Sequence, residues 1–263
     1  MGPELAIEDL FNVKGKVILV TGGSRGMGFA IAEGFVKAGA RVYISSRNDQ
    51  ACESAALSLT RYGECISLPA DVGQIDGCRS IASAIGERES RLDVLINNAG
   101  TIWAEKLLDY PESGWDKAFN VNVKGPFFLV QAVTPLLLAA ASPEDPARII
   151  TIGSIDGFHV PAHETYAYSS SKAAVHHLSR HLAAHFAPLN VTVNVIAPGL
   201  FKSKMLKGTI EQLGEDAVLE PVPLKRFATS ADVAGTAIYL ASKAGSYVTG
   251  AVLPVDGGMA TTI

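Results

Sequence analysis

The sequence has few cysteines, few aromatic residues and no excess of positive charge, and these shortages exclude several classes of protein. Its 263 residues are 7% aromatic and include three cysteines, Cys52, Cys65 and Cys78, without a C-x-x-C pair. This pattern argues against a disulfide framework and a thiolate zinc site, and it favours a reducing compartment. Lysine and arginine number 22 against 26 acidic residues, a net charge of −4. We therefore expect no nucleic-acid partner and no binding to an anionic membrane.

Long hydrophobic runs and targeting signals are also lacking. The most apolar stretch, residues 126–141, is interrupted by Gln131, Thr134 and Pro135, and we expect it to be too short and too punctuated to span a bilayer. Residues 1–12 lack the basic flank and the apolar run of a signal peptide. These absences predict a soluble, cytoplasmic protein.

The hydrophobic residues, 48% of the chain, fall into an alternating pattern. Such a fraction excludes a disordered chain and supports a large core. Short β-branched runs, which we expect to be strands, lie at 17–21, 41–45, 65–68, 94–97, 148–152, 192–196 and 252–255. Segments of helical periodicity lie at 26–38, 49–62, 74–89, 112–141, 166–187 and 230–241. The alternation predicts one α/β domain over residues 1–263, with a doubly wound sheet of about seven parallel strands and helices on both faces.

One connection is longer than the others. Residues 200–223 hold Gly208, Gly214, Pro221 and Pro223 and show only weak amphipathic periodicity. Connections of this length in compact domains are usually functional or mobile. We interpret residues 200–223 as a lid over a substrate, and a plain surface excursion is the alternative.

A glycine-rich turn follows the first expected strand. Residues 21–28 read Thr-Gly-Gly-Ser-Arg-Gly-Met-Gly, and a helical pattern follows. Gly22 allows a tight turn, Gly26 lets a pyrophosphate approach the backbone, and Gly28 lets the helix pack on the strand. The helix N-terminus presents free N–H groups to the phosphates. We interpret the turn as a dinucleotide phosphate loop, against the alternative of a tight turn without a ligand. The expected cofactor contacts of this loop are Gly22, Ser24, Arg25, Gly26, Met27 and Gly28.

A tyrosine and a lysine stand four residues apart in the expected helix 166–187. Tyr168 and Lys172 therefore share one helix face. A phenol is a poor base at neutral pH, and a neighbouring cation lowers its pKa. The pair can then exchange a proton with an alcohol or carbonyl oxygen. Tyr166 has Ser170 at the matching position and lacks the cation. An exposed surface pair is the alternative interpretation.

Two further polar residues stand at informative places. Ser154 follows the expected strand 148–152, and its hydroxyl can donate to a substrate oxygen. Asn122 lies inside the expected helix 112–141, where asparagine is mildly unfavourable and needs a reason. Ligands of open parallel sheets bind beyond the carboxyl ends of the strands, where the glycine turn and Ser154 are expected to meet. Each residue taken alone is more often structural.

Together these motifs resemble the short-chain dehydrogenase/reductase family over essentially the whole chain. Asp71-Val72, Asn97-Asn98-Ala99-Gly100 and Pro198-Gly199 complete the set in the family's order and spacing. The resemblance implies a single-domain Rossmann fold that binds a nicotinamide dinucleotide. It also implies that the helices 112–141 and 166–187 form a dimer face, in a homodimer or homotetramer.

The family's residue roles carry over to matching positions. The resemblance makes Tyr168 the acid/base, and Lys172 the residue that lowers its pKa and contacts the ribose. It makes Ser154 the group that positions the substrate oxygen, and Asn122 the anchor of a proton-relay water. The other implied cofactor contacts are Asp71 and Val72 at the adenine, Asn98, Ala99 and Gly100 on the adenosine side, Pro198, Gly199 and Phe201 near the nicotinamide, and Ser203, where the family usually has threonine.

The end of the second expected strand indicates which dinucleotide binds. Selectivity for NAD usually needs an acidic residue there, which accepts a hydrogen bond from the ribose 2′-hydroxyl. Ser46, Arg47 and Asn48 follow the strand, with no carboxylate before Asp49. A guanidinium binds a 2′-phosphate, and Arg25 approaches the same place from the glycine turn. We predict NADP(H), and the alternative is that both arginines are solvated surface charges.

The predicted reaction is the reduction of a carbonyl to a secondary alcohol, with hydride from the nicotinamide and a proton from Tyr168. The leading substrate class is a 3-oxoacyl thioester. Alternatives are a ketone or quinone of secondary metabolism and a sugar or polyol. A sensor that binds NADP without turnover is disfavoured because Tyr168 and Lys172 are both present. The residues expected to line the substrate are Trp103, Ile155, Asp156, His159 and Met205.

Histidines recur every four residues on the helix of Tyr168, at His177, His181 and His185. Two such side chains can share a metal ion. No H-E-x-x-H pattern occurs, and no carboxylate is spaced to complete a site. We therefore expect no metal and interpret these histidines as a structural or interface face.

Overall fold

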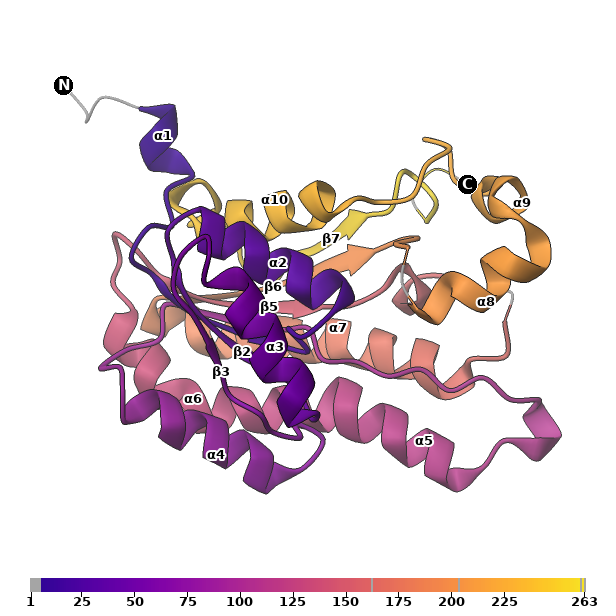
Figure 1. Ribbon diagram of the computed structural model, residues 1–263, viewed down its shortest axis with the longest axis horizontal. Helices are drawn as coiled ribbons and strands as arrows, with labels where there is room; N and C mark the ends of the chain where they lie inside the picture. The colour runs from indigo at the N-terminus through magenta and orange to yellow at the C-terminus, as the bar shows by residue number, and fades with distance from the viewer. Residues whose placement is uncertain (1–5, 162, 203, 261, 263) are drawn as a thin grey trace.

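A single parallel sheet forms the centre of the protein (Figure 1). The computed structural model describes residues 6–161, 163–202, 204–260 and 262. Within these ranges the strands are β1 Val17–Thr21, β2 Arg41–Ser45, β3 Cys65–Ser67, β4 Val94–Asn97, β5 Ala147–Ile152, β6 Val191–Pro198 and β7 Val252–Val255. They lie side by side in the order β3-β2-β1-β4-β5-β6-β7, every pair parallel. The expected doubly wound, seven-stranded parallel sheet is confirmed.

Helices cover both faces of this sheet. Every residue of the central strands β1, β4 and β5 is therefore buried, whichever face its side chain points to. The described helices are α1 Ile7–Leu10, α2 Gly26–Lys37, α3 Asp49–Leu59, α4 Ile75–Gly86, α5 Glu112–Phe119, α6 Gly125–Ala140, α7 Tyr166–Phe186, α8 Lys204–Leu213, α9 Glu215–Leu219 and α10 Ser230–Ala241. One core contains buried residues of α2, α3 and α10, and the other contains those of α4, α6 and α7. In Figure 1, α10 lies above the strands, and α4 and α6 lie below them.

The expected helix 112–141 consists of three parts. Between α5 and α6 the chain makes a π-helical turn, η2 Asn120–Lys124, in which the Gly125 N–H donates to the Asn120 carbonyl. A π turn is a local bulge in a helix and often lies at a functional site. The cause here is Asn122, whose side chain is buried and fully engaged, as described below.

This continuous helix, Glu112–Ala140, has the length and composition to cross a membrane, and its most apolar stretch of 18 residues has a mean hydropathy of 1.5. The expectation concerned the apolar run 126–141 alone; the helix reaches this length because it extends back through the π turn to Glu112. Leu129, Val130 and Val133 are nevertheless buried in the core that α6 shares with α4. Core helices of soluble proteins pass the same test, so the helix is weak evidence for a membrane span.

Residues 200–223 contain two helices, α8 and α9, which lie outside the main layers, at the end of the molecule toward which β6 and β7 point (Figure 1). Backbone hydrogen bonds hold the two ends of the segment. The Ala228 N–H donates to the Leu200 carbonyl at 2.8 Å, and the Leu224 N–H donates to the Gly257 carbonyl at 3.1 Å. The excursion is therefore anchored at its two ends beside the carboxyl edge of the sheet.

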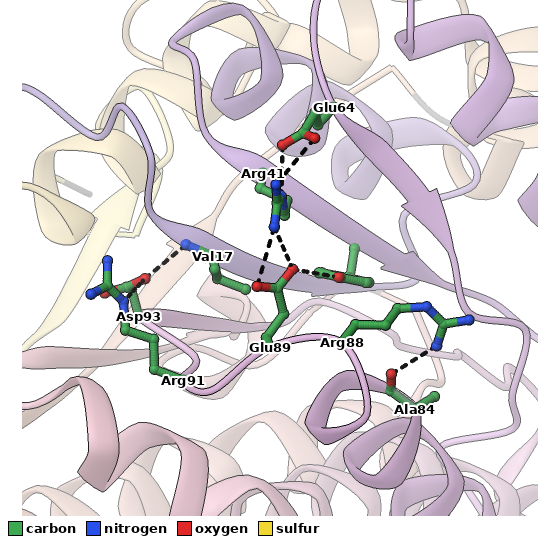
Figure 2. Close-up of polar contacts among 9 residues, drawn as sticks. Val17, Arg41, Glu64, Ala84, Arg88, Glu89, Arg91 and Asp93 are labelled. Atoms are coloured by element: carbon green, nitrogen blue, oxygen red, sulfur yellow. Dashed lines mark hydrogen bonds and ion pairs between the residues drawn. The ribbon is translucent and has the colours of Figure 1, made fainter.

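The opposite, amino-terminal edge of the sheet carries a charged network. Glu89 accepts hydrogen bonds from the Tyr43 hydroxyl at 2.6 Å and from Arg41 at 3.0 Å, and Arg41 also pairs with Glu64 (Figure 2). Asp93 accepts from the Val17 N–H at 2.8 Å. These contacts tie the connection before β4 to β1 and β2. The network lies far from the strand ends at which ligands bind in this architecture.

Candidate active site

The glycine turn after β1 has the conformation that a phosphate loop requires. Gly22 and Gly26 have φ angles of 66° and 58°, in the left-handed region. A Cβ built on Gly26 meets no atom within 4 Å, so its backbone faces open space. A Cβ on Gly28 would lie 2.3 Å from Asn98 Nδ2 and 2.4 Å from the Gly22 carbonyl oxygen. Gly28 therefore lets α2 lie close to the backbone that directly follows β1 and to Asn98, a close approach of the kind expected for a helix packed on a strand.

Asn98 joins the glycine turn to the loop after β4. Its Nδ2 donates to the carbonyls of Thr21 at 2.8 Å and Gly22 at 3.3 Å. The backbone N–H groups of Asn98 and Ala99 both donate to Thr21 Oγ1, each at 3.0 Å. Asn98 thus fixes two neighbouring strand ends relative to each other. Its side chain does this structural work, which the sequence did not reveal.

The end of β2 offers unpaired positive charge. Arg25 and Arg47 are exposed, and neither side chain makes a hydrogen bond or ion pair within the described residues. Ser46 Oγ donates to the Asn48 carbonyl at 3.3 Å, and Asn48 Oδ1 caps α3 by accepting from the Ala51 N–H at 2.7 Å. The open glycine turn and two free guanidinium groups fit a phosphorylated dinucleotide.

The other residues expected to contact the cofactor lie in different surroundings. The carboxylate of Asp71 accepts from the Gly73 N–H at 2.9 Å, and Val72 is buried. Gly100 lies beside the catalytic candidates, since a Cβ there would be 3.5 Å from Asn122 Oδ1 and 3.7 Å from Lys172 Nζ. The remaining members are Pro198 at the end of β6, Gly199 and Phe201 just after it, Met27 and Ser24 in the glycine turn, and Ser203, which lies outside the described residues.

Ser154, Tyr168 and Lys172 come together where β5 ends against α7. Lys172 is buried, its Nζ donates to the Ile152 carbonyl at 2.8 Å, and the same atom lies 5.6 Å from the centre of the Tyr168 ring. Ser154 Oγ accepts from the Asp156 N–H at 3.1 Å. That bond holds the serine oxygen and leaves its proton available for donation.

The protonation of this trio differs from expectation. Burial raises the pKa of Tyr168 to about 12; a hydrogen bond with Ser154 lowers it and the Asp156 carboxylate raises it. Burial lowers the pKa of Lys172 to about 8, although Asp156 opposes this. Tyr168 was expected to have a lowered pKa; the net shift is upward instead, because desolvation of the phenol outweighs the hydrogen bond with Ser154. Tyr168 is therefore a neutral phenol at pH 7, the form that donates a proton.

Asn122 connects the π turn to the same centre. Its Oδ1 accepts from the Thr101 N–H and its Nδ2 donates to the Thr101 carbonyl, both at 2.9 Å. Nδ2 also donates to Ser171 Oγ at 2.9 Å, and Ser171 donates to the Tyr168 carbonyl at 2.6 Å. Three hydrogen bonds offset the cost of an asparagine inside a helix. The unusual position of Asn122 was the signal that it has a special role.

The expected substrate residues are not equivalent. Ile155 is buried, which leaves it little surface for a substrate, and the Trp103 indole packs on Gly114 of α5. Asp156 and His159 are partly exposed on the segment after Ser154, and burial raises the pKa of Asp156. Met205 belongs to α8, but its side chain lies outside the described part of the chain.

Within the described residues, no group of three or more His, Cys, Asp or Glu side chains could hold a metal ion. His177, His181 and His185 are exposed along α7. Cys52, Cys65 and Cys78 are free, buried thiols whose pKa values burial raises. Sequence reasoning placed His176 beside this series and gave it no role of its own, yet it is the one buried histidine of α7 in the described chain.

Comparison with known proteins decides the family. The enoyl-(acyl carrier protein) reductase profile matches residues 22–260. A Pseudomonas aeruginosa rhamnolipids biosynthesis 3-oxoacyl-[acyl-carrier-protein] reductase is 45% identical over 94% of this chain and 97% of its own length. The chain is a short-chain dehydrogenase/reductase. It is an oxidoreductase, as its motifs predicted.

Solved structures and other relatives agree. The Pseudomonas aeruginosa RhlG/NADP active-site complex superposes with a TM-score of 0.93 and 45% identity, covering 96% of this chain and 99% of that one. A Bacillus subtilis 2-dehydro-3-deoxy-D-gluconate 5-dehydrogenase is 34% identical over 96% of this chain and 97% of its own length. The family thus includes reductases of acyl thioesters and dehydrogenases of sugar acids.

Proposed function

We propose that this enzyme uses NADPH to reduce a 3-oxoacyl thioester to the 3-hydroxyacyl thioester. The observation that carries the proposal is the neutral phenol of Tyr168 held beside Ser154 and Lys172, in a chain 45% identical to a 3-oxoacyl-[acyl-carrier-protein] reductase. A related structure at the same identity is described as an NADP complex, which supports the choice of cofactor. Residues 1–263 would act as one domain.

The residues present fit the cofactor. The open turn at Gly26 and the N-terminus of α2 would hold the pyrophosphate, and Arg25 and Arg47 the 2′-phosphate. Asp71 would border the adenine, and Lys172 the ribose. The bound NADPH supplies hydride to the carbonyl carbon.

The protein's own residues would manage the carbonyl oxygen. The Tyr168 phenol donates its proton to that oxygen, and the Ser154 hydroxyl donates a hydrogen bond that orients it. The ammonium of Lys172 supplies positive charge beside the tyrosinate that forms. Asn122 holds the Thr101 loop and, through Ser171, the backbone of Tyr168.

NADPH-consumption assays test the proposed substrate. We expect the highest kcat/KM for 3-oxoacyl thioesters, compared with quinones, cyclic ketones and 2-dehydro or 5-keto sugar acids. Sugar acids are the second candidate, because a 34% identical relative is a gluconate-type dehydrogenase and because Asp156 and His159 place polar groups near Ser154. A preference for sugar acids over every thioester would refute the first assignment.

We predict that Arg47→Ala reduces the preference for NADPH over NADH at least about tenfold, since a charge-assisted contact contributes roughly 1.5–3 kcal/mol. The measurement is KM for both cofactors. Arg88→Ala is the matched control, because Arg88 lies at the opposite edge of the sheet and, among the described residues, donates only to the Ala84 carbonyl. If Arg47→Ala weakened both cofactors equally, Arg47 would not bind the 2′-phosphate.

We propose that residues 200–223 close over the substrate, with α8 and α9 as the moving part. Only Val218 is buried among the described side chains of these two helices, and backbone hydrogen bonds tie the segment near its ends, which favours local opening. Hydrogen exchange in α8 and α9 should be faster than in β1 and β5 without ligand, and should slow in a ternary complex. Equal protection in both states, at the level of the core strands, would rule out a closing lid.

We also propose a homodimer or homotetramer that works in the cytoplasm. Trp115, Phe127 and Leu138 expose apolar surface along α5 and α6, within the helix 112–141 that the family resemblance implies for the dimer face. Three free thiols are compatible with a reducing compartment. Light scattering should give twice or four times the chain mass of 27.6 kDa, and a monomer would refute the assembly.

A further inference from the structure

His176 is a buried titratable residue next to the reacting trio that the reaction does not use. It lies on α7 one turn beyond Lys172, so both side chains emerge from the same helix face. The whole residue is 4% exposed, whereas its neighbour His177 is exposed. A histidine this deeply buried needs a partner or a function.

The imidazole of His176 packs against the turn that carries Ser154. Its Nε2 accepts a hydrogen bond from the Ser154 N–H at 3.4 Å. A Cβ on Gly153 would lie 2.2 Å from Nε2, and a Cβ on Gly157 would lie 2.5 Å from Cε1. The ring of Phe158 packs against it with centroids 4.9 Å apart. Two glycines therefore leave the space that this imidazole fills.

Burial and the positive charges of Lys172 and Arg180 lower the pKa of His176 to about 4. The imidazole is neutral at any pH at which the enzyme is expected to work. Only a neutral imidazole has a lone pair on Nε2 with which to accept the Ser154 N–H. The low pKa and the hydrogen bond thus agree.

We propose that His176 is a positioning residue for the reduction. Its imidazole accepts the hydrogen bond from the Ser154 backbone N–H and so keeps the serine hydroxyl beside Tyr168. The Asp156 N–H holds Ser154 Oγ from the other side. With both contacts in place, the serine keeps one orientation toward the phenol and the substrate oxygen. This role rests on the proposed carbonyl chemistry, but it does not depend on which carbonyl compound is the substrate.

The role predicts a specific kinetic signature. The hydrogen bond with Ser154 lowers the pKa of Tyr168, while burial and Asp156 raise it. Other charged groups at this centre are Lys172 on α7, and His159 and His163, which act on Asp156. A displaced Ser154 should therefore reduce kcat and raise the apparent pKa for alcohol oxidation, in which tyrosinate is the base, while leaving NADPH affinity unchanged.

The test compares His176→Met with His176→Gln, using whichever carbonyl and alcohol pair the wild type turns over. Methionine fills the space without accepting strongly, whereas the glutamine Oε1 can occupy the Nε2 position. We expect His176→Met to lower kcat at least tenfold and raise the apparent pKa for oxidation, and His176→Gln to restore most of both. His177→Met is the matched control on the exposed face and should match the wild type.

Several results would overturn the proposal. If His176→Met kept the wild-type kcat and pH profile, Ser154 would not need the hydrogen bond to His176. Equal losses in both variants, with equal losses of thermal stability and NADPH binding, would show a purely structural residue. Failure of the wild type to reduce thioesters refutes the proposed substrate alone, because the comparison then runs on another carbonyl compound.

Discussion

Tyr168→Phe is expected to reduce kcat at least a hundredfold while NADPH still binds. Only the transferable proton is lost, and a positioned general acid contributes roughly 10²–10⁴-fold. The phenol has a pKa raised to about 12, so it is fully protonated at pH 7 and acts as an acid in the direction of reduction. The measurement is steady-state NADPH oxidation together with cofactor titration by fluorescence.

Tyr166→Phe is the matched control for this substitution. Tyr166 lies half a turn earlier on α7, and its hydroxyl donates to Glu164 at the surface, so its loss should leave kcat unchanged. A Tyr168→Phe enzyme that keeps a tenth or more of wild-type kcat would contradict the assignment. Such a residual corresponds to less than about 1.4 kcal/mol of transition-state stabilisation, which is too little for a proton donor.

Gly28→Ala is expected to lower NADPH affinity at least about tenfold and to reduce the free energy of unfolding by roughly 1–3 kcal/mol, a typical cost of overpacking. The new methyl group would overlap the Gly22 carbonyl, 2.4 Å away, and displace Asn98 from the turn. Because Gly22 is held at a positive φ, the turn has little freedom to adapt. Calorimetric titration and denaturant unfolding measure the two effects.

Gly235→Ala serves as the control for Gly28→Ala. Gly235 lies inside α10, and a Cβ there meets no atom within 4 Å. Alanine is the better helix former by about 0.5–1 kcal/mol, so this variant should be unchanged or slightly more stable. If Gly28→Ala bound NADPH as tightly as Gly235→Ala does, the glycine turn would not be the phosphate site.

Most of the fold follows from the spacing of apolar residues. The strand expected at 148–152 is β5 Ala147–Ile152, and the strand expected at 192–196 is β6 Val191–Pro198. Buried parallel strands have continuous apolar runs, which makes them easy to find. The helices α1 and α9 were not predicted, because four or five residues are too few to show a periodic pattern. The helix α8 is amphipathic, and it was missed because Gly208 inside it and Gly214 after it were interpreted as signs of a loop.

The site could be predicted where a sequence motif identifies the reacting groups. It could be predicted less well where the burial of a side chain determines its pKa or its role. Tyr168, Lys172 and Ser154 do meet, as their positions indicated. The direction of the tyrosine pKa was wrong, because pairwise reasoning about a neighbouring cation omits the desolvation of the phenol. His176 was given no role of its own because the four-residue spacing of His177, His181 and His185 directed attention to the exposed side of α7.

The π turn at Asn120–Lys124 determines how the long helix would respond to the deletion of a residue. It absorbs one extra residue, so the orientations of α5 and α6 about their common axis are offset by about 100° from those of an unbroken helix. Deleting Val121 would restore regular hydrogen bonding at the expense of this offset. Gly114 would then turn by about 100° relative to α6, so its contact with Trp103 and the core contacts of α6 would no longer be aligned together. The π turn thus lets one long helix fit two packing surfaces that a regular helix of this sequence would not match.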